Sequence, residues 1–175
     1  SVNIPENLRS SGLIISSIND ALKDNNELVE KIIKSSNSKE DKYTALNNAA
    51  FNSGIFVHIP KNLIIEEPIH LLSCLSNDGI STISRNLIVA EDNTKATIVQ
   101  ELYSPETQTQ QAYLELLNTK VGSNSNLDVT TLQMMEQNSV NFSTRQTSST
   151  VTDNLYTSLD NQSIIKKLNL MSAAF

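Results

Sequence analysis

The chain contains few of the residues that usually build binding or catalytic sites. Its 175 residues include one cysteine, Cys74, no tryptophan, four glycines and four prolines. A single cysteine excludes an intramolecular disulfide and a CxxC metal clamp. It also excludes ligation of an iron–sulfur cluster by this chain alone, because such clusters typically need four ligands, most of them thiolates.

Basic residues are scarce and dispersed. The formal net charge is −6 and the pI is about 4.9. Lys166-Lys167 is the only adjacent basic pair. Nucleic-acid binding needs clustered lysine and arginine to neutralise phosphates, so we expect no nucleic-acid partner.

Long hydrophobic runs are absent as well. No stretch approaches 18 consecutive apolar residues, and the first residues lack the basic-then-apolar order of a signal peptide. We therefore expect a soluble, cytoplasmic protein without membrane contact. The sequence also lacks a GxxxxGK[ST] loop for ATP and a GxSxG nucleophile elbow.

Small polar residues are abundant instead, with 21 asparagines and 23 serines. Such a composition is compatible with disorder, but here it separates regular short apolar runs, as in repeated strands and turns. With so few glycines, asparagine is expected to adopt the left-handed conformations that turns need. This pattern is typical of a coiled β solenoid.

Residues 1–37 are predicted to form a helical segment and linker. Apolar residues at helical spacing predict two short helices within residues 12–34, interrupted at Asn25-Asn26. The polar stretch from Ser35 to Ser38 is the best linker candidate.

Residues 38–53 are predicted to form a further helix that leads into the core. Tyr43, Leu46 and Ala50 fall on one helical face. Ser38 with Asp41 three residues later resembles a capping box.

The pattern changes at Gly54, after which β-branched and aromatic residues dominate. Pro60 and Pro68 limit the first strands to a few residues. Strand-like runs are Ile55–Ile59, Leu63–Ile65, Ile69–Leu75, Ile80–Ile83, Leu87–Ala90, Ala96–Leu102, Tyr113–Leu117, Leu127–Met134, Val140–Ser143, Leu155–Leu159 and Ile164–Leu170.

One internal repeat is visible. The segments starting at Asn93 and Asn124 both read asparagine, hydroxyl, polar, apolar, polar, apolar. A turn asparagine before alternating apolar residues suits stacked coils, each of which buries its face against its neighbours. We therefore expect a mainly β protein in which residues 54–175 form a parallel β-helix that lacks its last coils.

The segment from Asn48 to Lys61 reads Asn-x-Ala-Phe-x-x-Gly-x-Phe-Val-x-x-Pro-Lys. It resembles the core signature of the SufB/SufD family of iron–sulfur cluster assembly proteins. Further similar stretches are Glu67–Leu72, Arg85–Val89, Glu91–Glu101, Leu132-Gln133 and Phe142–Thr144. The resemblance spans roughly residues 12–159 and implies a right-handed parallel β-helix.

Details within the resemblance favour SufD over SufB. The phrase Glu67–Leu71 followed by Arg85–Val89 is similar to SufD. SufB-type sequences usually carry a cysteine two residues after the glutamate that matches Glu101, and Tyr103 stands there instead.

The resemblance implies a non-catalytic scaffold role in a SufBCD complex. The implied partners are a SufB-type paralogue and a SufC-type ABC ATPase, which would dock on a C-terminal helical region that this chain lacks. A homodimer is an alternative assembly. An iron–sulfur cluster would be present transiently in the full complex, and none would be bound by this fragment.

For Cys74, His58 and His70 a structural role is an alternative to a chemical one. Cys74 lies between leucines, which favours a buried, unreactive thiol over a sulfur-relay role. His58 alternates with Val57 and Ile59 and is expected on the opposite strand face. We assign neither His58 nor His70 as a metal ligand.

No catalytic, cofactor-binding or metal-binding residue is assigned. A SufB-like role is one alternative. A carbohydrate-binding or carbohydrate-active solenoid is another, using a pair of carboxylates held across a cleft. The candidates for it are Glu66, Glu67, Glu91, Asp92 and Glu101. The lack of tryptophan argues against a sugar-stacking groove.

Overall fold

The computed structural model describes residues 2–35, 41–75, 81–106, 108–149 and 165–171. Its helices are α1 (Glu6–Ser10), α2 (Ile18–Asp24), α3 (Asn26–Ser35) and α4 (Lys42–Ala50). Its strands are β1 (Ile14–Ser17), β2 (Ile55–Ile59), β3 (Ile69–Cys74), β4 (Ser81–Ala90), β5 (Lys95–Tyr103), β6 (Gln111–Val121), β7 (Asn126–Met134), β8 (Ser139–Ser149) and β9 (Ile165–Met171). The predicted mainly β class is therefore confirmed. In these ranges no helix has the length and apolar character required to cross a membrane.

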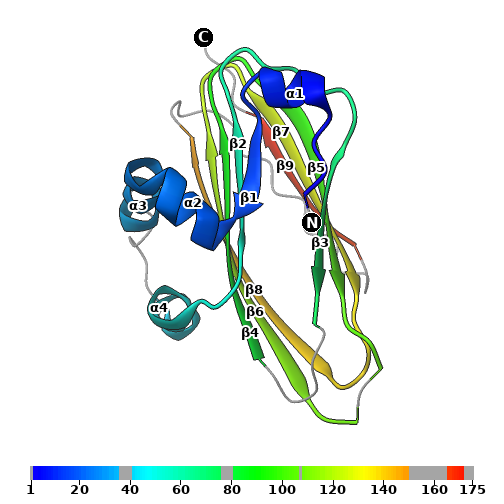
Figure 1. Ribbon diagram of the computed structural model, residues 1–175. Helices are drawn as coiled ribbons and strands as arrows, with labels where there is room; N and C mark the ends of the chain where they lie inside the picture. The colour runs from blue at the N-terminus through cyan, green and yellow to red at the C-terminus, as the bar shows by residue number, and fades with distance from the viewer. Residues whose placement is uncertain (1, 36–40, 76–80, 107, 150–164, 172–175) are drawn as a thin grey trace.

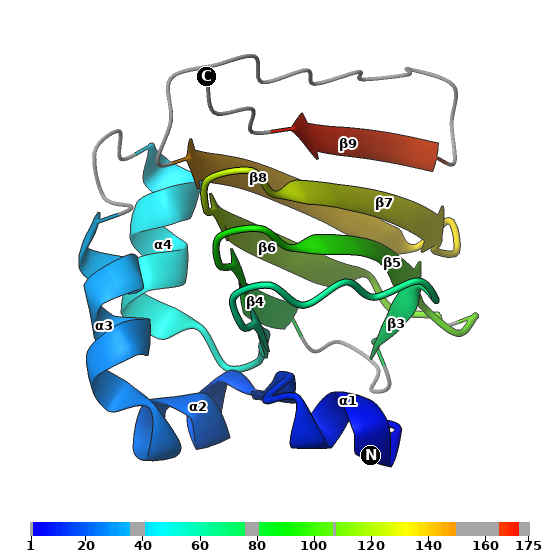
Figure 2. The ribbon, with the colours of Figure 1, turned by 90° about the horizontal axis from the view of Figure 1, so that it is seen from above.

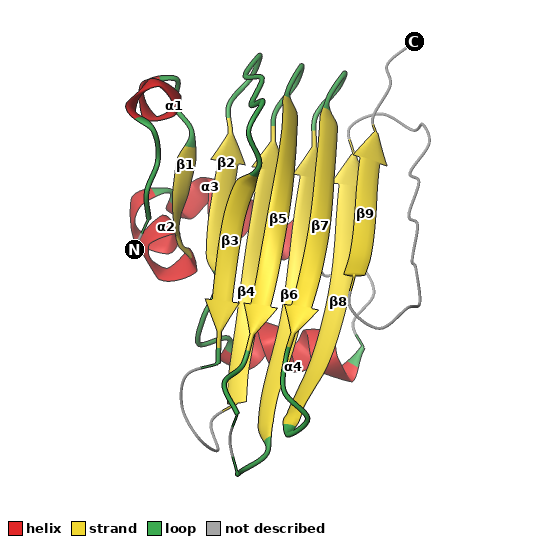
Figure 3. Ribbon diagram, turned by 90° about the vertical axis from the view of Figure 1, so that its right-hand side faces the viewer, coloured by secondary structure: helices red, strands yellow, loops and turns green. Residues whose placement is uncertain are grey.

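The strands form two facing sheets (Figure 1). Sheet A has the order β1-β2-β4-β6-β8 and sheet B the order β3-β5-β7-β9. From β2 to β8 the chain enters the two sheets alternately, and all neighbours in this run pair in parallel. We call one passage through both sheets a coil. Figure 3 shows the strands of successive coils side by side.

The main hydrophobic core fills the space between the sheets. Each inner face uses every second residue of its strands, as strand geometry requires. The buried side chains from sheet A are Val57, Ile59, Ile88, Ala90, Leu117 and Val121, and those from sheet B are Ile69, Leu71, Ala96, Ile98, Leu127 and Val129.

Helices α2 and α3 cover the outer face of sheet A (Figure 2). Their apolar residues pack on Phe56, Leu87 and Val89, which alternate with the inward-facing residues. Sheet A is thus buried on both faces here, which explains its continuous apolar runs. The two predicted helices are confirmed, but Ile14–Ser17 before them forms β1, antiparallel to β2.

Helix α4 differs from its prediction in cap and in buried face. Asp41 is the N-cap, and its carboxylate accepts hydrogen bonds from the amides of Tyr43 and Thr44. The predicted face is wrong, because Leu46 is exposed whereas Thr44 and Asn47 are buried. The helix contacts the backbone of β4 through a polar side chain, because the Asn47 amide donates to the carbonyl of Ser84 at 2.8 Å.

The helix-to-strand junction depends on Gly54. Its φ is 155°, and a Cβ placed there would lie 2.0 Å from the backbone oxygen of Arg85. Any side chain would therefore force the backbones of neighbouring coils apart. This close approach lets Ser53 bridge to Ser84 just before β2 begins.

Three asparagines stack at the corner between the sheets. Asn62, Asn93 and Asn124 have positive φ angles of 65°, 57° and 56°. The Asn93 amide donates to Asn62 Oδ1 at 3.0 Å, and that of Asn124 donates to Asn93 Oδ1 at 3.3 Å, each across 31 residues. The structure therefore confirms the predicted repeat of Asn93 and Asn124. Asn62 is a third member of the repeat, which the sequence pattern did not reveal.

One predicted interruption of a strand is wrong. The runs before and after Ser84-Arg85-Asn86 join into the single strand β4. Arg85 and Asn86 stay in the strand because their side chains form hydrogen bonds with residues of other segments. The Arg85 guanidinium donates to Asn48 Oδ1, and the Asn86 amide donates to Glu115 Oε1 at 2.7 Å.

Other strand bounds also differ. β6 and β8 run beyond their predicted ends because their later residues are polar but still pair across the sheet. Leu63–Ile65 forms only an isolated bridge, between Ile64 and Lys95. The predicted strand Leu155–Leu159 lies outside the described residues.

The last described strand runs in an unexpected direction. β9 pairs antiparallel with β7, whereas a continuing coil would be parallel. Alternation of apolar residues does not encode direction, because both orientations satisfy the hydrogen bonds of a sheet edge. The predicted parallel coil is therefore wrong for residues 165–171.

The asparagine stack predicts an order of stabilities. Asn93→Gly keeps the left-handed backbone but loses two exposed side-chain hydrogen bonds, and should lower the free energy of unfolding by about 1 kcal/mol. Asn93→Ala loses the same hydrogen bonds but, unlike the glycine variant, keeps a Cβ in the left-handed conformation, so it should be roughly 1 kcal/mol less stable than Asn93→Gly. Urea unfolding of both variants measures the difference. An alanine variant as stable as the glycine variant would contradict this role of backbone conformation.

Candidate functional site

Cys74 is exposed, so its predicted burial is wrong. Residues 69, 71 and 75 of this segment are buried, and strand alternation therefore turns Cys74 outward. Leu71 and Leu75 lie on the opposite face, and Leu72, on the same face as the thiol, is itself exposed, so the leucines do not enclose Cys74. Cys74 lies beside Tyr103 of the neighbouring strand on the outer face of sheet B.

The two histidines each pair with one glutamate from the next coil. His58 Nε2 lies 3.0 Å from Glu91 Oε1, and His70 Nδ1 lies 2.9 Å from Glu101 Oε1. As predicted, His58 lies on the face opposite Val57. Among the described residues no group of three or more histidine, cysteine or acidic side chains is placed to hold a metal ion.

The acidic residues at the end of β4 join neighbouring coils. Glu91 Oε2 accepts a hydrogen bond from the amide of Lys61, and Asp92 Oδ1 accepts one from the amide of Ser123 at 2.8 Å. The hydrogen bond from His58 is the main cause that lowers the pKa of Glu91, and that from Ser123 the main cause that lowers the pKa of Asp92. These carboxylates are therefore engaged in structural contacts.

The five carboxylates weighed for glycoside hydrolysis are also divided between elements. Glu101 belongs to sheet B and pairs with His70, whereas Glu91 follows β4 and pairs with His58. Glu66 and Glu67 lie in the segment between β2 and β3. Glu91 and Asp92 are adjacent and interact electrostatically, but both are engaged in hydrogen bonds to the neighbouring coils, so the structure offers no support for an acid pair.

A buried polar cluster lies between the sheets, and sequence reasoning missed it. Glu115 is only 3% exposed. It accepts hydrogen bonds from the side chains of Asn86, Gln100 and Ser143. In the sequence Glu115 lies two residues from both Tyr113 and Leu117, so strand alternation places all three side chains on one face. This spacing is the signal that could have identified Glu115 as buried.

The cluster continues to the last coil through Thr131, which donates to Gln100 Oε1 at 3.2 Å. Arg145 Nη2 in turn donates to Thr131 Oγ1 at 2.6 Å. Burial lowers the pKa of Arg145, and the charge of Glu115 opposes that shift. Both sheets thus supply an interior layer of donors and acceptors around one carboxylate.

Tyr113 lies at the edge of this cluster. Burial is the main cause that raises its pKa to about 12, and the charge of Glu115 adds to the shift. Among the described residues no hydrogen bond of its hydroxyl has ordinary geometry, although the nearby side chains of Ser84, Ser73 and Asn86 oppose the rise of its pKa. The neutral phenol is therefore strongly favoured in the folded state.

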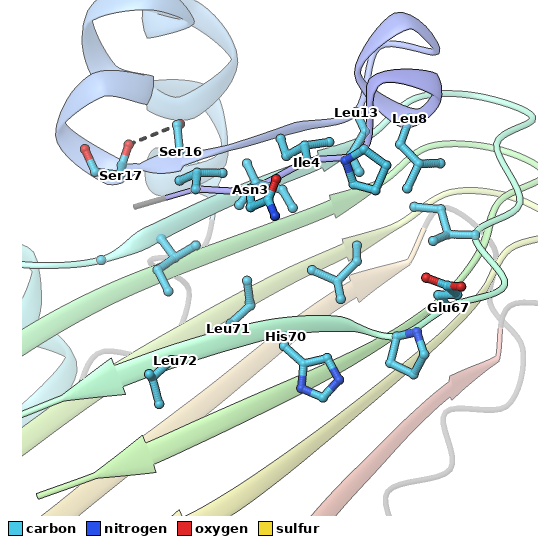
Figure 4. Close-up of a pocket in the computed structure, with 18 residues that line it drawn as sticks. Asn3, Ile4, Leu8, Leu13, Ser16, Ser17, Glu67, His70, Leu71 and Leu72 are labelled. Carbon is cyan, nitrogen blue, oxygen red and sulfur yellow. Dashed lines mark hydrogen bonds between the residues drawn. The ribbon is translucent and has the colours of Figure 1, made fainter.

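A second candidate is an open pocket of about 590 Å³ at the other end of the core (Figure 4). It lies between β1 and β3, and residues 2–5 form part of its wall. Most lining side chains are aliphatic, with Glu67 and His70 at the β3 side. Such a pocket has the size of a small-molecule or peptide site.

The raised pKa of Tyr113 predicts an alkaline loss of stability. Because the folded-state pKa of about 12 lies above the usual 10, this contribution is complete below pH 10 and is lost as pH rises through 12. Wild-type protein should lose about 2 kcal/mol over that range through this group. Tyr113→Phe should lose correspondingly less and should be as stable at neutral pH.

Urea unfolding across the alkaline range measures this difference. Tyr103→Phe, at an exposed tyrosine, is the matched control and should behave as wild type. Equal alkaline losses in wild type and Tyr113→Phe would contradict the prediction.

The chain matches two consecutive family models. Residues 3–71 match the SufBD protein N-terminal region, and residues 73–163 match the SufBD core domain of SUF system FeS cluster assembly. Similar proteins include the iron–sulfur cluster assembly SufBD family proteins of Staphylococcus aureus strain USA300, 25% identical, and Staphylococcus saprophyticus, 24% identical, each over 146 residues. Both alignments cover 83% of this chain and 31% of the relative, so the chain spans about a third of their length. The two consecutive matches show that the chain belongs to the SufBD family.

Proposed function

We propose that the chain acts as a non-catalytic scaffold segment in SUF iron–sulfur cluster assembly. The observation that carries this proposal is the pair of family matches, which together run from residue 3 to residue 163. The names of the relatives also refer to iron–sulfur cluster assembly. The cluster itself is the cargo of such a system and is supplied with ligands by other parts of the assembly.

The scaffold would be the first part of a right-handed parallel β-helix. Alternation of the chain between two parallel sheets supports this architecture. So does the 31-residue stacking of the turn asparagines. A solenoid is stabilised by contacts between adjacent coils, which suits it to hold partner sites at fixed separations.

The proposed role is SufD-like. Tyr103 occupies the position where SufB-type sequences usually carry a cysteine, and it is 44% exposed on sheet B. A phenol at that place provides no thiolate for sulfur or iron. In this proposal the paralogue of SufB type contributes the thiols, and a SufC-type ATPase drives the complex in the cytoplasm.

The proposed complex should be recovered when the protein is purified together with its partners. Affinity purification of the full-length protein from its own cells should recover a P-loop ATPase and a cysteine-bearing paralogue, because the scaffold has its function only within that assembly. Mass spectrometry of the purified material identifies both. Isolation as a lone monomer, with cluster assembly unaffected by deletion of the gene, would refute the proposal.

The 175-residue chain by itself should not retain a cluster. After incubation with iron and sulfide and removal of excess reagents, we expect the same negligible visible absorbance for wild type and Cys74→Ser. One exposed thiol cannot replace four ligands. A stable absorbance that Cys74→Ser abolishes would identify Cys74 as a cluster ligand and contradict this part of the proposal.

A further inference from the structure

The pocket between β1 and β3 lies between two sheet edges. β1 is the terminal strand of sheet A, and β3 is the terminal strand of sheet B. Within the described residues, β3 pairs only with β5 and has no neighbour on its other side. An unpaired edge offers a row of backbone donors and acceptors to another extended chain.

The free backbone groups of β3 face the pocket side of the strand. The amide of Leu75 donates to the carbonyl of Tyr103 in β5 at 2.9 Å. Successive residues of a strand direct their backbone groups alternately to the two sides. The N–H and C=O groups of His70 and Leu72 therefore point away from β5, and both residues line the pocket.

The pocket walls are matched to aliphatic side chains. Leu13, Ile65 and Leu71 belong to the inner core and also line the pocket, which has a volume of about 590 Å³ (Figure 4). Filling it with alkyl groups would remove apolar surface from water at roughly 25 cal/mol per Å².

The pocket also has a charge preference. Glu67 lines it and is exposed, and no ion pair or hydrogen bond engages its carboxylate among the described residues. The chain as a whole carries a net charge of −6. A cationic side chain is therefore the complementary group at this end of the pocket.

We propose that this pocket binds an extended peptide segment of another protein, which adds to β3 as a further strand. Its aliphatic side chains, at alternate positions, enter the pocket, and a lysine or arginine lies beside Glu67. This mode gives affinity through main-chain hydrogen bonds and specificity through alternate side chains. The inference is independent of the scaffold role in cluster assembly.

The geometry selects a single strand over a second folded copy of the chain. Residues 2–5 and β1 form the wall opposite β3. The sheet edge of a second copy would bring its own flanking layers against this wall. One extended segment needs only the space between the two edges.

The test uses the labelled peptide Arg-Val-Thr-Val-Thr-Val, and its reverse-order counterpart, titrated with the 175-residue chain. Fluorescence anisotropy should show saturable binding with one peptide per monomer. Backbone N-methylation of one alternate set of amides should weaken binding at least fivefold, because those amides face β3. Methylation of the other set should be tolerated. Equal effects of the two sets, or no saturable binding of either peptide, would overturn the proposal.

A matched pair of variants tests the strand edge. Leu72→Pro removes an N–H that points away from β5, and Leu72 is 66% exposed, so β3 should remain paired. It should weaken peptide binding roughly fivefold relative to Leu72→Ala, which retains the N–H. Circular dichroism confirms that both variants are folded. Equal affinities of the two folded variants would contradict strand addition.

A second matched pair tests the charge. Glu67→Lys should weaken binding of the arginine peptide about threefold at low salt, within the range measured for exposed ion pairs. Glu66→Lys changes the net charge equally at an exposed neighbour that does not line the pocket, and should have no effect. Equal weakening by both would refute the contact with Glu67.

Sedimentation distinguishes the peptide from a second copy of the chain as the occupant of the pocket. A dimer that Leu72→Pro disrupts, together with no peptide binding, would show that the occupant is a second copy and would overturn the proposal.

Discussion

Stacking of successive coils is the constraint on which the rest of the structure depends, and three of the five parallel strand pairs keep an offset of 31 residues. It places Asn62, Asn93 and Asn124 above one another, so that each turn can donate a hydrogen bond to the previous one. A slip of one residue would exchange the two faces of every strand and expose the aliphatic layer between the sheets. The turn geometry and the hydrophobic core therefore specify the same register.

The offset is shorter in two parallel pairs, 29 residues between β3 and β5 and 28 between β6 and β8. In the second of these pairs, Asn118 lies opposite Gln146. The interior also contains a polar layer that crosses several coils, in which Glu115 of β6 accepts hydrogen bonds from side chains of β4, β5 and β8. A buried carboxylate without donors is costly, so its hydrogen-bond partners must lie in fixed places. Polar contacts thus specify the packing where the aliphatic layer ends.

The sequence was most informative where local chemistry and tertiary structure agree. The bounds of β2 were predicted correctly, because Ile55–Ile59 is an apolar run between Gly54 and Pro60. The spacing of Asn93 and Asn124 revealed the coil length. Prediction failed where a partner distant in sequence decides the outcome.

Arg85 is a clear example of such a failure. A charged residue inside an apolar run usually marks a break, yet here it is fully buried in β4 and donates to Asn48. Burial alone lowers its pKa to about 10. Cys74 illustrates a different limit: its leucine neighbours predict burial, but strand alternation directs Leu71 and Leu75 inward and leaves Cys74 and Leu72 exposed on the outer face. Local composition predicts burial of a segment, and strand parity decides which of its side chains are buried.

The two candidate sites are connected through the same core. Ile55 and Leu71 line the open pocket and also a small void of about 10 Å³ deeper in the core. That void is lined as well by Asn86 and Gln100, the donors to Glu115. Because a closely packed interior transmits displacement of its side chains, a strand added at β3 would reach the polar cluster through these aliphatic contacts and through the amide of Ile55, which donates to Asn86 Oδ1 at 2.9 Å. Coupling between the two sites therefore requires movement of Leu71 or Ile55, and a rigid layer there keeps the sites independent.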